Sequence, residues 1–129
     1  MLVKSYAAAV QGISATVVTI EVNCTKGIQF FLVGLPDVAV RESHERIIAP
    51  ADIRKEGSSY DLPLAIGILA AAGELEASRL DQYMMMGELS LDGSLKPVKG
   101  ILPIAIKARE EGFKGFIVPE QNAREAAVV

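Results

Sequence analysis

Ser59 is the residue whose type and surroundings best suit covalent chemistry. It lies in the stretch RKEGSSYDLPLAIG (54–67), where a charged, glycine-containing loop leads into an apolar run. A serine hydroxyl becomes a useful nucleophile when a neighbouring base accepts its proton. That base could be a histidine or a lysine that burial keeps neutral. The candidates are His44, Lys55, Lys96, Lys99 and Lys107. Residue types alone do not rank them, and the same stretch would also suit an ordinary helix start.

Other kinds of site find little support in the sequence. A phosphate-binding loop needs the order G-x-x-x-x-G-K-[ST], because backbone amides must surround the phosphates. The run GSLKPVKG (93–100) has a different order, and Pro97 removes one amide donor. Acidic residues are not clustered as magnesium ligands would be, and Cys24 and His44 show no zinc-ligand spacing. We therefore expect no cofactor and no metal in this chain, with Cys24 an inert thiol and His44 on the packed side of a helix.

Composition and charge limit the class of protein. The 129 residues are 50% apolar, which suits one soluble α/β domain. A net charge of −3 argues against a free-standing nucleic-acid binder, which would usually be basic. A single cysteine fits a reduced, cytoplasmic setting. The N-terminus has no signal-peptide pattern, and the longest apolar runs are too short to span a bilayer, so we expect no membrane partner.

The elements that would position Ser59 follow from the hydrophobic periodicity. Three strands joined by short turns are expected at residues 3–10, 14–23 and 28–35, which suggests an antiparallel meander. Helices are expected at 37–49 and 61–73. Pro63 must lie near the start of the second helix because it has no N–H. The N-cap then falls at Tyr60 or Asp61, and Asp61 is the better cap by its chemistry.

The second half of the chain continues the alternation of strands and helices. A strand is expected over 83–91, followed by a tight turn at Asp92-Gly93 and a short returning strand. The remaining elements are a helix over 101–111, a strand over 115–119 and the beginning of another helix at 121. Interleaved strands and helices indicate an α/β or α+β class.

Three long blocks carry a resemblance to a known family. They read FFLVGLPDVAVRESHERI (30–47), PADIRKEGSSYDLPLAIGILAA (50–71) and GELSLDGSLKPVKGILPIAIKARE (87–110). Together they resemble the N-terminal domain of the magnesium-chelatase-related AAA+ ATPases, the ComM/YifB family. That domain is in turn similar to the proteolytic domain of Lon proteases. The resemblance implies a ribosomal protein S5 domain 2-like fold, with a mixed sheet packed against helices, and a single domain over residues 1–129.

The Lon resemblance permits a comparison of catalytic residues. The Lon nucleophile lies in a K-D-G-P-S-A-G block, and the matching KEGSSYD (55–61) places Ser59 at the nucleophile. The second Lon block runs from G-E-I-T-L to L-P-I-G-G-L-K, where the last lysine is the base. Aligned without gaps from GELSL, it puts Leu102 at the lysine position, and an isobutyl group cannot accept a proton. Tyr60 and Asp61 add bulk after the serine, so no catalytic residue is expected.

The leading interpretation is a non-catalytic, Lon-like accessory domain at the front of a larger AAA+ ATPase. The resemblance implies a parent that binds ATP and Mg, assembles as a hexameric ring and acts as a DNA helicase in branch migration. The implied partners are its own AAA+ domain, after residue 129, and neighbouring subunits. The alternative is a Lon-type Ser–Lys peptidase that pairs Ser59 with Lys99. It requires the lysine amine within about 3 Å of the serine hydroxyl.

A third interpretation is a DNA-contacting module. The Lon similarity brings two loops near one another, and together they would carry a small basic patch inside a ring channel. The residues of this patch are Arg54, Lys55, Lys96 and Lys99. The competing interpretation is a set of solvated loop residues, which the acidic net charge and the lack of aromatic stacking groups favour.

One departure from the family concerns residues 49 and 50. In the family, a stretch that includes a strand separates the two blocks on either side, whereas here Ala49 joins Pro50 directly. Either this stretch was deleted or the numbering passes over residues that are missing, and we expect the second. A spacing of about 3.8 Å between the two Cα atoms would argue against that expectation.

Overall fold

The computed structural model describes residues 2–24, 27–33 and 59–129. The expected helix over 37–49, with His44, and the junction of Ala49 with Pro50 lie outside the described residues. Within those residues, strands and helices follow the predicted order, except that two strands take the place of the one expected over 83–91.

Three strands open the chain as an antiparallel meander, as the periodicity predicted. They are β1 (Leu2–Gln11), β2 (Ser14–Cys24) and β3 (Ile28–Val33). β1 pairs with β2 over its whole length, and β2 pairs with β3 on its other side. Gly12 turns the chain between β1 and β2 at a φ of 61°, which glycine adopts without strain.

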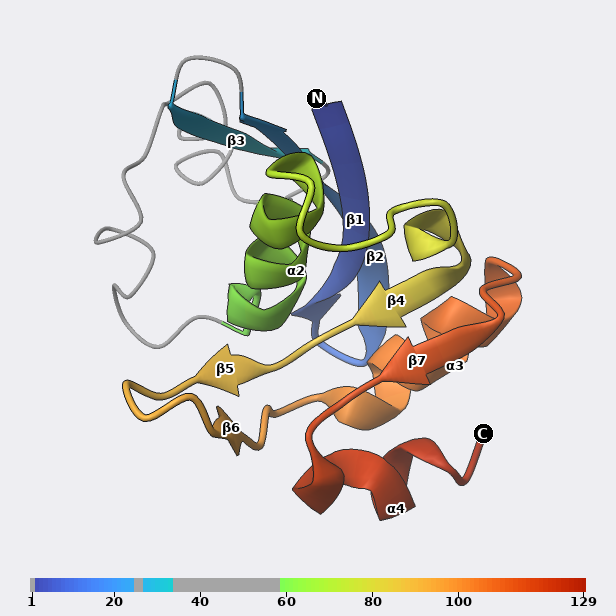
Figure 1. Cartoon of the computed structure of the whole chain (residues 1–129). Helices are drawn as coiled ribbons and strands as arrows, with labels where there is room; N and C mark the ends of the chain where they lie inside the picture. The colour runs from blue at the N-terminus through green and yellow to red at the C-terminus, as the bar shows by residue number, and fades with distance from the viewer. Residues whose placement is uncertain (1, 25–26, 34–58) are drawn as a thin grey trace.

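Two short strands extend this meander into a five-stranded mixed sheet. β4 (Tyr83–Met85) lies parallel to β1, and β7 (Gly115–Ile117) lies parallel to β4. The strand order is β3-β2-β1-β4-β7 (Figure 1). A mixed sheet packed with helices confirms the predicted α/β class.

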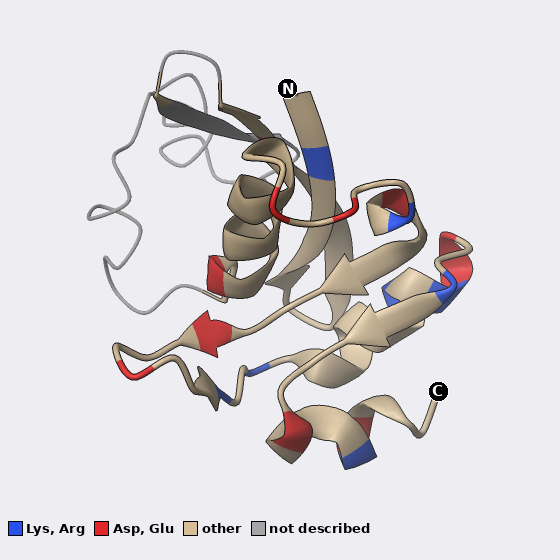
Figure 2. Cartoon of the chain, viewed as in Figure 1, with Lys and Arg blue, Asp and Glu red and all other residues tan. Residues whose placement is uncertain are grey.

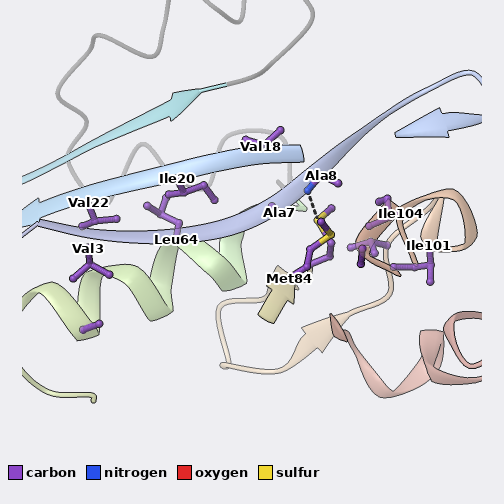
Figure 3. Close-up of a cluster of buried hydrophobic side chains, with 14 of the residues drawn as sticks. Val3, Ala7, Ala8, Val18, Ile20, Val22, Leu64, Met84, Ile101 and Ile104 are labelled. Atoms are coloured by element: carbon purple, nitrogen blue, oxygen red, sulfur yellow. Dashed lines mark hydrogen bonds between the residues drawn. The ribbon is translucent and has the colours of Figure 1, made fainter. Parts of the chain in front are cut away.

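Two helices, α2 (Asp61–Ala71) and α3 (Ile101–Glu110), pack on β1 and β2 and enclose the core. Figure 3 shows Leu64 of α2 beneath the sheet, with Ile101 and Ile104 of α3 on the side of Met84. All four side chains are at most 3% exposed. The remaining helical segments are short: η3 (Leu80–Gln82), η4 (Glu120–Asn122) and α4 (Ala123–Ala126).

A buried polar contact also joins α2 to the sheet. Ser5 of β1 is fully buried, and its hydroxyl donates a hydrogen bond to the carbonyl oxygen of Pro63 at 2.9 Å. On the same helix, a Cβ added at Gly67 would lie 2.9 Å from Cγ2 of Val22 and 3.5 Å from Oγ of Ser5. Glycine at this position therefore lets the helix approach β1 and β2 closely.

The prediction of a single strand over residues 83–91 is wrong. The chain instead changes partners at Gly87: the N–H of Met86 still bonds to the sheet through the carbonyl of Ile117 (3.0 Å). Beyond it, β5 (Glu88–Leu89) and β6 (Leu95–Lys96) form a separate antiparallel pair. We call residues 88–96 the ribbon, and Figure 1 shows it extending away from the five-stranded sheet.

Candidate functional site

Ser59 lies in the turn that leads into α2, and this turn is tied to the start of the ribbon. The N–H of Gly87 donates to the carbonyl of Ser59 at 2.9 Å, and the N–H of Leu62 donates to the carbonyl of Gly87 at 2.9 Å. Ser59 itself is half-buried. The backbone at Ser59 and at Leu62, three residues later, is therefore engaged in hydrogen bonds with residue 87.

Asp61 is not the N-cap of α2, so that expectation is wrong. Tyr60 occupies the N-cap position without a side-chain cap, and Asp61 is the first residue of the helix. Its Oδ2 instead accepts a hydrogen bond from the N–H of Leu89 in β5, at 3.0 Å. The carboxylate bonds to the ribbon and does not cap the helix, because the ribbon lies against the start of α2.

The environment of Asp61 alters its acidity. Its side chain is only 5% exposed. Burial raises the pKa of Asp61 because it disfavours the charged form. The hydrogen bond from Leu89 opposes this shift, and the nearby charge of Glu88 adds to it. This environment could not be predicted from the sequence, because it depends on packing between segments that lie far apart in the chain.

The start of α3 carries the position that the Lon comparison assigns to the base. Leu102 is the second residue of α3 and is 37% exposed. Gly100, at the N-cap, has a φ of 77°, and an added Cβ there would meet Cγ2 of Val10 at 2.7 Å. Lys99 precedes this glycine and lies exposed on the connecting loop.

The loop between β6 and α3 is held by a residue that sequence reasoning missed. The side-chain amide of Asn122 accepts from the N–H of Val98 at 2.9 Å and donates to its carbonyl at 3.0 Å. Both contacts are buried. Lys96 and Lys99 lie on either side of this anchored residue and are exposed. No local pattern around residue 122 predicts a contact with residue 98.

The basic patch is described only in part. Arg54 and Lys55 lie outside the described residues, so their relation to Lys96 and Lys99 stays a prediction. In the described part of the chain, no three His, Cys, Asp or Glu side chains are grouped closely enough to hold a metal ion.

A pocket of about 490 Å³ lies between the start of α2 and the ribbon. Its lining mixes carboxylates, apolar side chains, one hydroxyl and one amine: Asp61, Glu88, Leu89, Ser90, Leu91, Asp92 and Lys96. Sequence reasoning missed this pocket, because it treated residues 83–91 as a single strand and so did not separate the ribbon from β4.

Comparison with known proteins places the chain in a family. The family model described as subunit ChlI of Mg-chelatase matches residues 47–122. The chain belongs to the magnesium-chelatase-related family. Competence protein ComM of Haemophilus influenzae is 41% identical over 144 residues, which cover 96% of this chain and 28% of that protein. Protein YifB of Escherichia coli is 37% identical over 138 residues, which cover 92% of this chain and 27% of that protein.

The chain thus spans less than a third of the length of these curated relatives. Both alignments are longer than the 129 residues of the chain, so each includes positions without a counterpart here. The expected gap between Ala49 and Pro50 stays a prediction.

A Lon protease is also among the known proteins that the chain resembles. Lon protease 2 of Bacillus subtilis is 33% identical over 73 residues, which cover 57% of this chain and 13% of that protein. The mixed sheet with its helices is compatible with a Lon-like fold. No helix in residues 2–24, 27–33 or 59–129 is long and apolar enough to cross a membrane.

Proposed function

We propose that this magnesium-chelatase-related chain is a non-catalytic, Lon-like accessory domain of an AAA+ ATPase. The parent would be an ATP-dependent DNA helicase or branch-migration motor, in the cytoplasm. ATP and Mg would bind in the AAA+ domain of the parent, and this chain would contact that domain and neighbouring subunits of a hexameric ring. Its role would be assembly or the coupling of subunits.

The observation that carries this proposal is that the turn containing Ser59 is hydrogen-bonded to the segment that leads into the ribbon. Three hydrogen bonds join residues 59–62 to residues 87–89, including the one from Leu89 to the Asp61 carboxylate. In a serine hydrolase, the residues after the nucleophile must leave room for an oxyanion and its donors. Here those residues are Tyr60 and the buried Asp61. Leu102, at the position assigned to the base, offers no proton acceptor.

The accessory role is tested by deleting residues 1–129 from the full-length protein. We expect the deletion to impair ring formation, measured by analytical ultracentrifugation with ATP, or to uncouple ATP hydrolysis from branch migration of a four-way DNA junction. Wild-type assembly together with wild-type branch migration in the deleted protein would contradict the proposal.

The absence of catalysis is tested separately with Ser59→Ala and Lys99→Ala in the full-length protein. We expect both variants to match the wild type in assembly, in branch migration and in the cleavage of unfolded protein substrates. Peptide cleavage by the wild type that disappears in Ser59→Ala would instead support the Ser–Lys peptidase.

A further inference from the structure

We propose that the pocket between α2 and the ribbon binds the guanidinium group of an arginine on a protein partner. This inference does not depend on the activity of the parent protein. It rests on a buried carboxylate oxygen without a partner, on acidic residues at the rim and on apolar walls that suit an arginine side chain.

The buried oxygen belongs to Asp61. Its Oδ2 accepts the N–H of Leu89, but its Oδ1 is buried and has no hydrogen-bond partner among the described residues. Leaving a buried polar atom without a partner costs about 1–3 kcal/mol, and more for a charged group. Because Asp61 lines the pocket, a donor entering from outside would offset that cost. A cation there would also oppose the effect of burial on the pKa of Asp61, since it favours the charged carboxylate.

The rim of the pocket adds two further carboxylates, from Glu88 and Asp92. Asp92 is held in place, because its Oδ1 accepts the N–H of Ser94 at 3.0 Å and the hydroxyl of Ser94 at 2.7 Å. Glu88 lies directly opposite Lys96 in the ribbon, yet the only ion pairs among the described residues are Lys4–Glu21 and Lys107–Glu111. Figure 2 shows acidic residues on β5 and in the turn of the ribbon. Three carboxylates against one amine favour a cationic ligand.

The geometry favours a guanidinium over other cations. A metal ion would need more closely grouped ligands than the described residues offer. A guanidinium presents five donors in a planar fork, so it can serve oxygens in different directions at once. Its aliphatic stem would pack on Leu89 and on Leu91, which is 88% exposed at the turn of the ribbon. A volume of about 490 Å³ leaves room for the residues that flank the arginine in the partner.

The test uses three probes that differ in one group: N-acetyl-arginine amide, its lysine counterpart and its citrulline counterpart. Citrulline keeps the shape of arginine but has no charge. Binding is followed by the backbone amide resonances of Leu89 and Ser90 during titration of the 129-residue chain. We expect saturable shifts with the arginine probe and about tenfold weaker binding, or more, with citrulline. The lysine probe should also bind more weakly, because it lacks the planar fork.

Variants of the pocket distinguish binding of arginine at this site from a nonspecific attraction of the cation to an acidic protein. Asp61→Asn keeps an acceptor for Leu89 and should weaken arginine binding about tenfold. Asp92→Asn, on the exposed ribbon, should weaken it by about twofold to fivefold without affecting the fold. Glu120→Gln, an exposed residue outside the pocket lining, should leave the affinity unchanged. Equal binding of arginine and citrulline, equal binding of arginine and lysine, or shifts that survive both pocket variants would overturn the proposal.

Discussion

One side chain, that of Asn122, satisfies both backbone groups of Val98. The amide oxygen accepts the N–H at 2.9 Å and the amide nitrogen donates to the carbonyl at 3.0 Å. Asn122 is 7% exposed and Val98 is also 7% exposed, so water does not readily replace either bond. The pair fixes the loop before α3 to the C-terminal segment, and with it the loop that carries Lys96 and Lys99.

Replacement of Asn122 should therefore be costly. Asn122→Ala removes both partners of Val98 at once and leaves a buried N–H and a buried carbonyl unsatisfied. We expect a loss of about 2–6 kcal/mol in the free energy of unfolding, since each of the two unsatisfied groups costs about 1–3 kcal/mol. Urea denaturation followed by far-ultraviolet circular dichroism measures this difference.

Two variants distinguish lost hydrogen bonds from lost packing at this site. Asn122→Asp retains the acceptor for the N–H of Val98 but has no donor for its carbonyl, so it should also destabilise the chain. Gln121→Ala changes the exposed neighbour and should shift the stability by less than about 0.5 kcal/mol. If Asn122→Ala cost no more than Gln121→Ala, the pair would not have the role argued here.

Local patterns predicted the elements whose signals lie within one segment. The alternation of polar and apolar residues in β2 agrees with its buried Val18, Ile20 and Val22, and the short turn expected between the first two strands is present at Gly12. The apolar run from Asp61 onward forms a buried helix, as expected. Each of these features depends on spacing along a single stretch, which hydrophobic periodicity reads directly.

The candidate site required contacts between distant segments, and sequence reasoning missed those. Asp61 had the chemistry of an N-cap, but the ribbon offers it the N–H of Leu89, 28 positions away. The change of partner at Gly87 divides one expected strand into two. Nothing in the order of residues marks where a strand leaves one sheet for another, because that point involves contacts between distant segments, such as the hydrogen bond from Leu62 to Gly87.

Gly67 offers a test of how closely α2 approaches the sheet. In an isolated helix, Gly67→Ala would gain about 1 kcal/mol from helix propensity. Here the new methyl group would lie 2.9 Å from Cγ2 of Val22, closer than side-chain atoms normally approach. Overpacking of a core usually costs about 1–3 kcal/mol, so we expect Gly67→Ala to lower the melting temperature despite its better propensity.

A double-mutant cycle with Val22→Ala assigns the cause. Val22→Ala removes the atom that the new methyl group would meet, so Gly67→Ala should be neutral or stabilising in that background. We expect a coupling free energy of about 1–3 kcal/mol between the two sites. Additive effects of the two substitutions would mean that some other contact limits residue 67.

The loop lysines provide a prediction about DNA. Lys96→Glu combined with Lys99→Glu reverses two exposed charges without touching the core. We expect the DNA affinity of the full-length protein to stay within about twofold at moderate salt, because the chain carries a net charge of −3 and few aromatic residues. A large, salt-dependent loss of affinity would instead support the DNA-contacting interpretation. Arg54→Glu with Lys55→Glu makes the matched test on the other loop.

Asp61 gives a prediction about the pH dependence of stability. Burial raises its folded-state pKa above the ordinary value of 3.8, even though the Leu89 N–H lowers it in part. Between 3.8 and that raised pKa, the folded state therefore binds a proton that the unfolded state has released. The contribution of Asp61 to stability must increase as the pH falls through this window and decrease as the pH rises through it.

Asp61→Asn isolates this contribution, because asparagine does not titrate and its amide oxygen can still accept the Leu89 N–H. We expect the wild type to gain stability relative to Asp61→Asn as the pH falls from neutral toward 3.8, measured by urea denaturation at each pH. Asp92 supplies the contrast, since hydrogen bonds from Ser94 lower its pKa. The wild type should lose stability relative to Asp92→Asn as the pH falls below the ordinary value. A pH-independent difference between the wild type and Asp61→Asn would show that residue 61 is accessible to water in the folded chain.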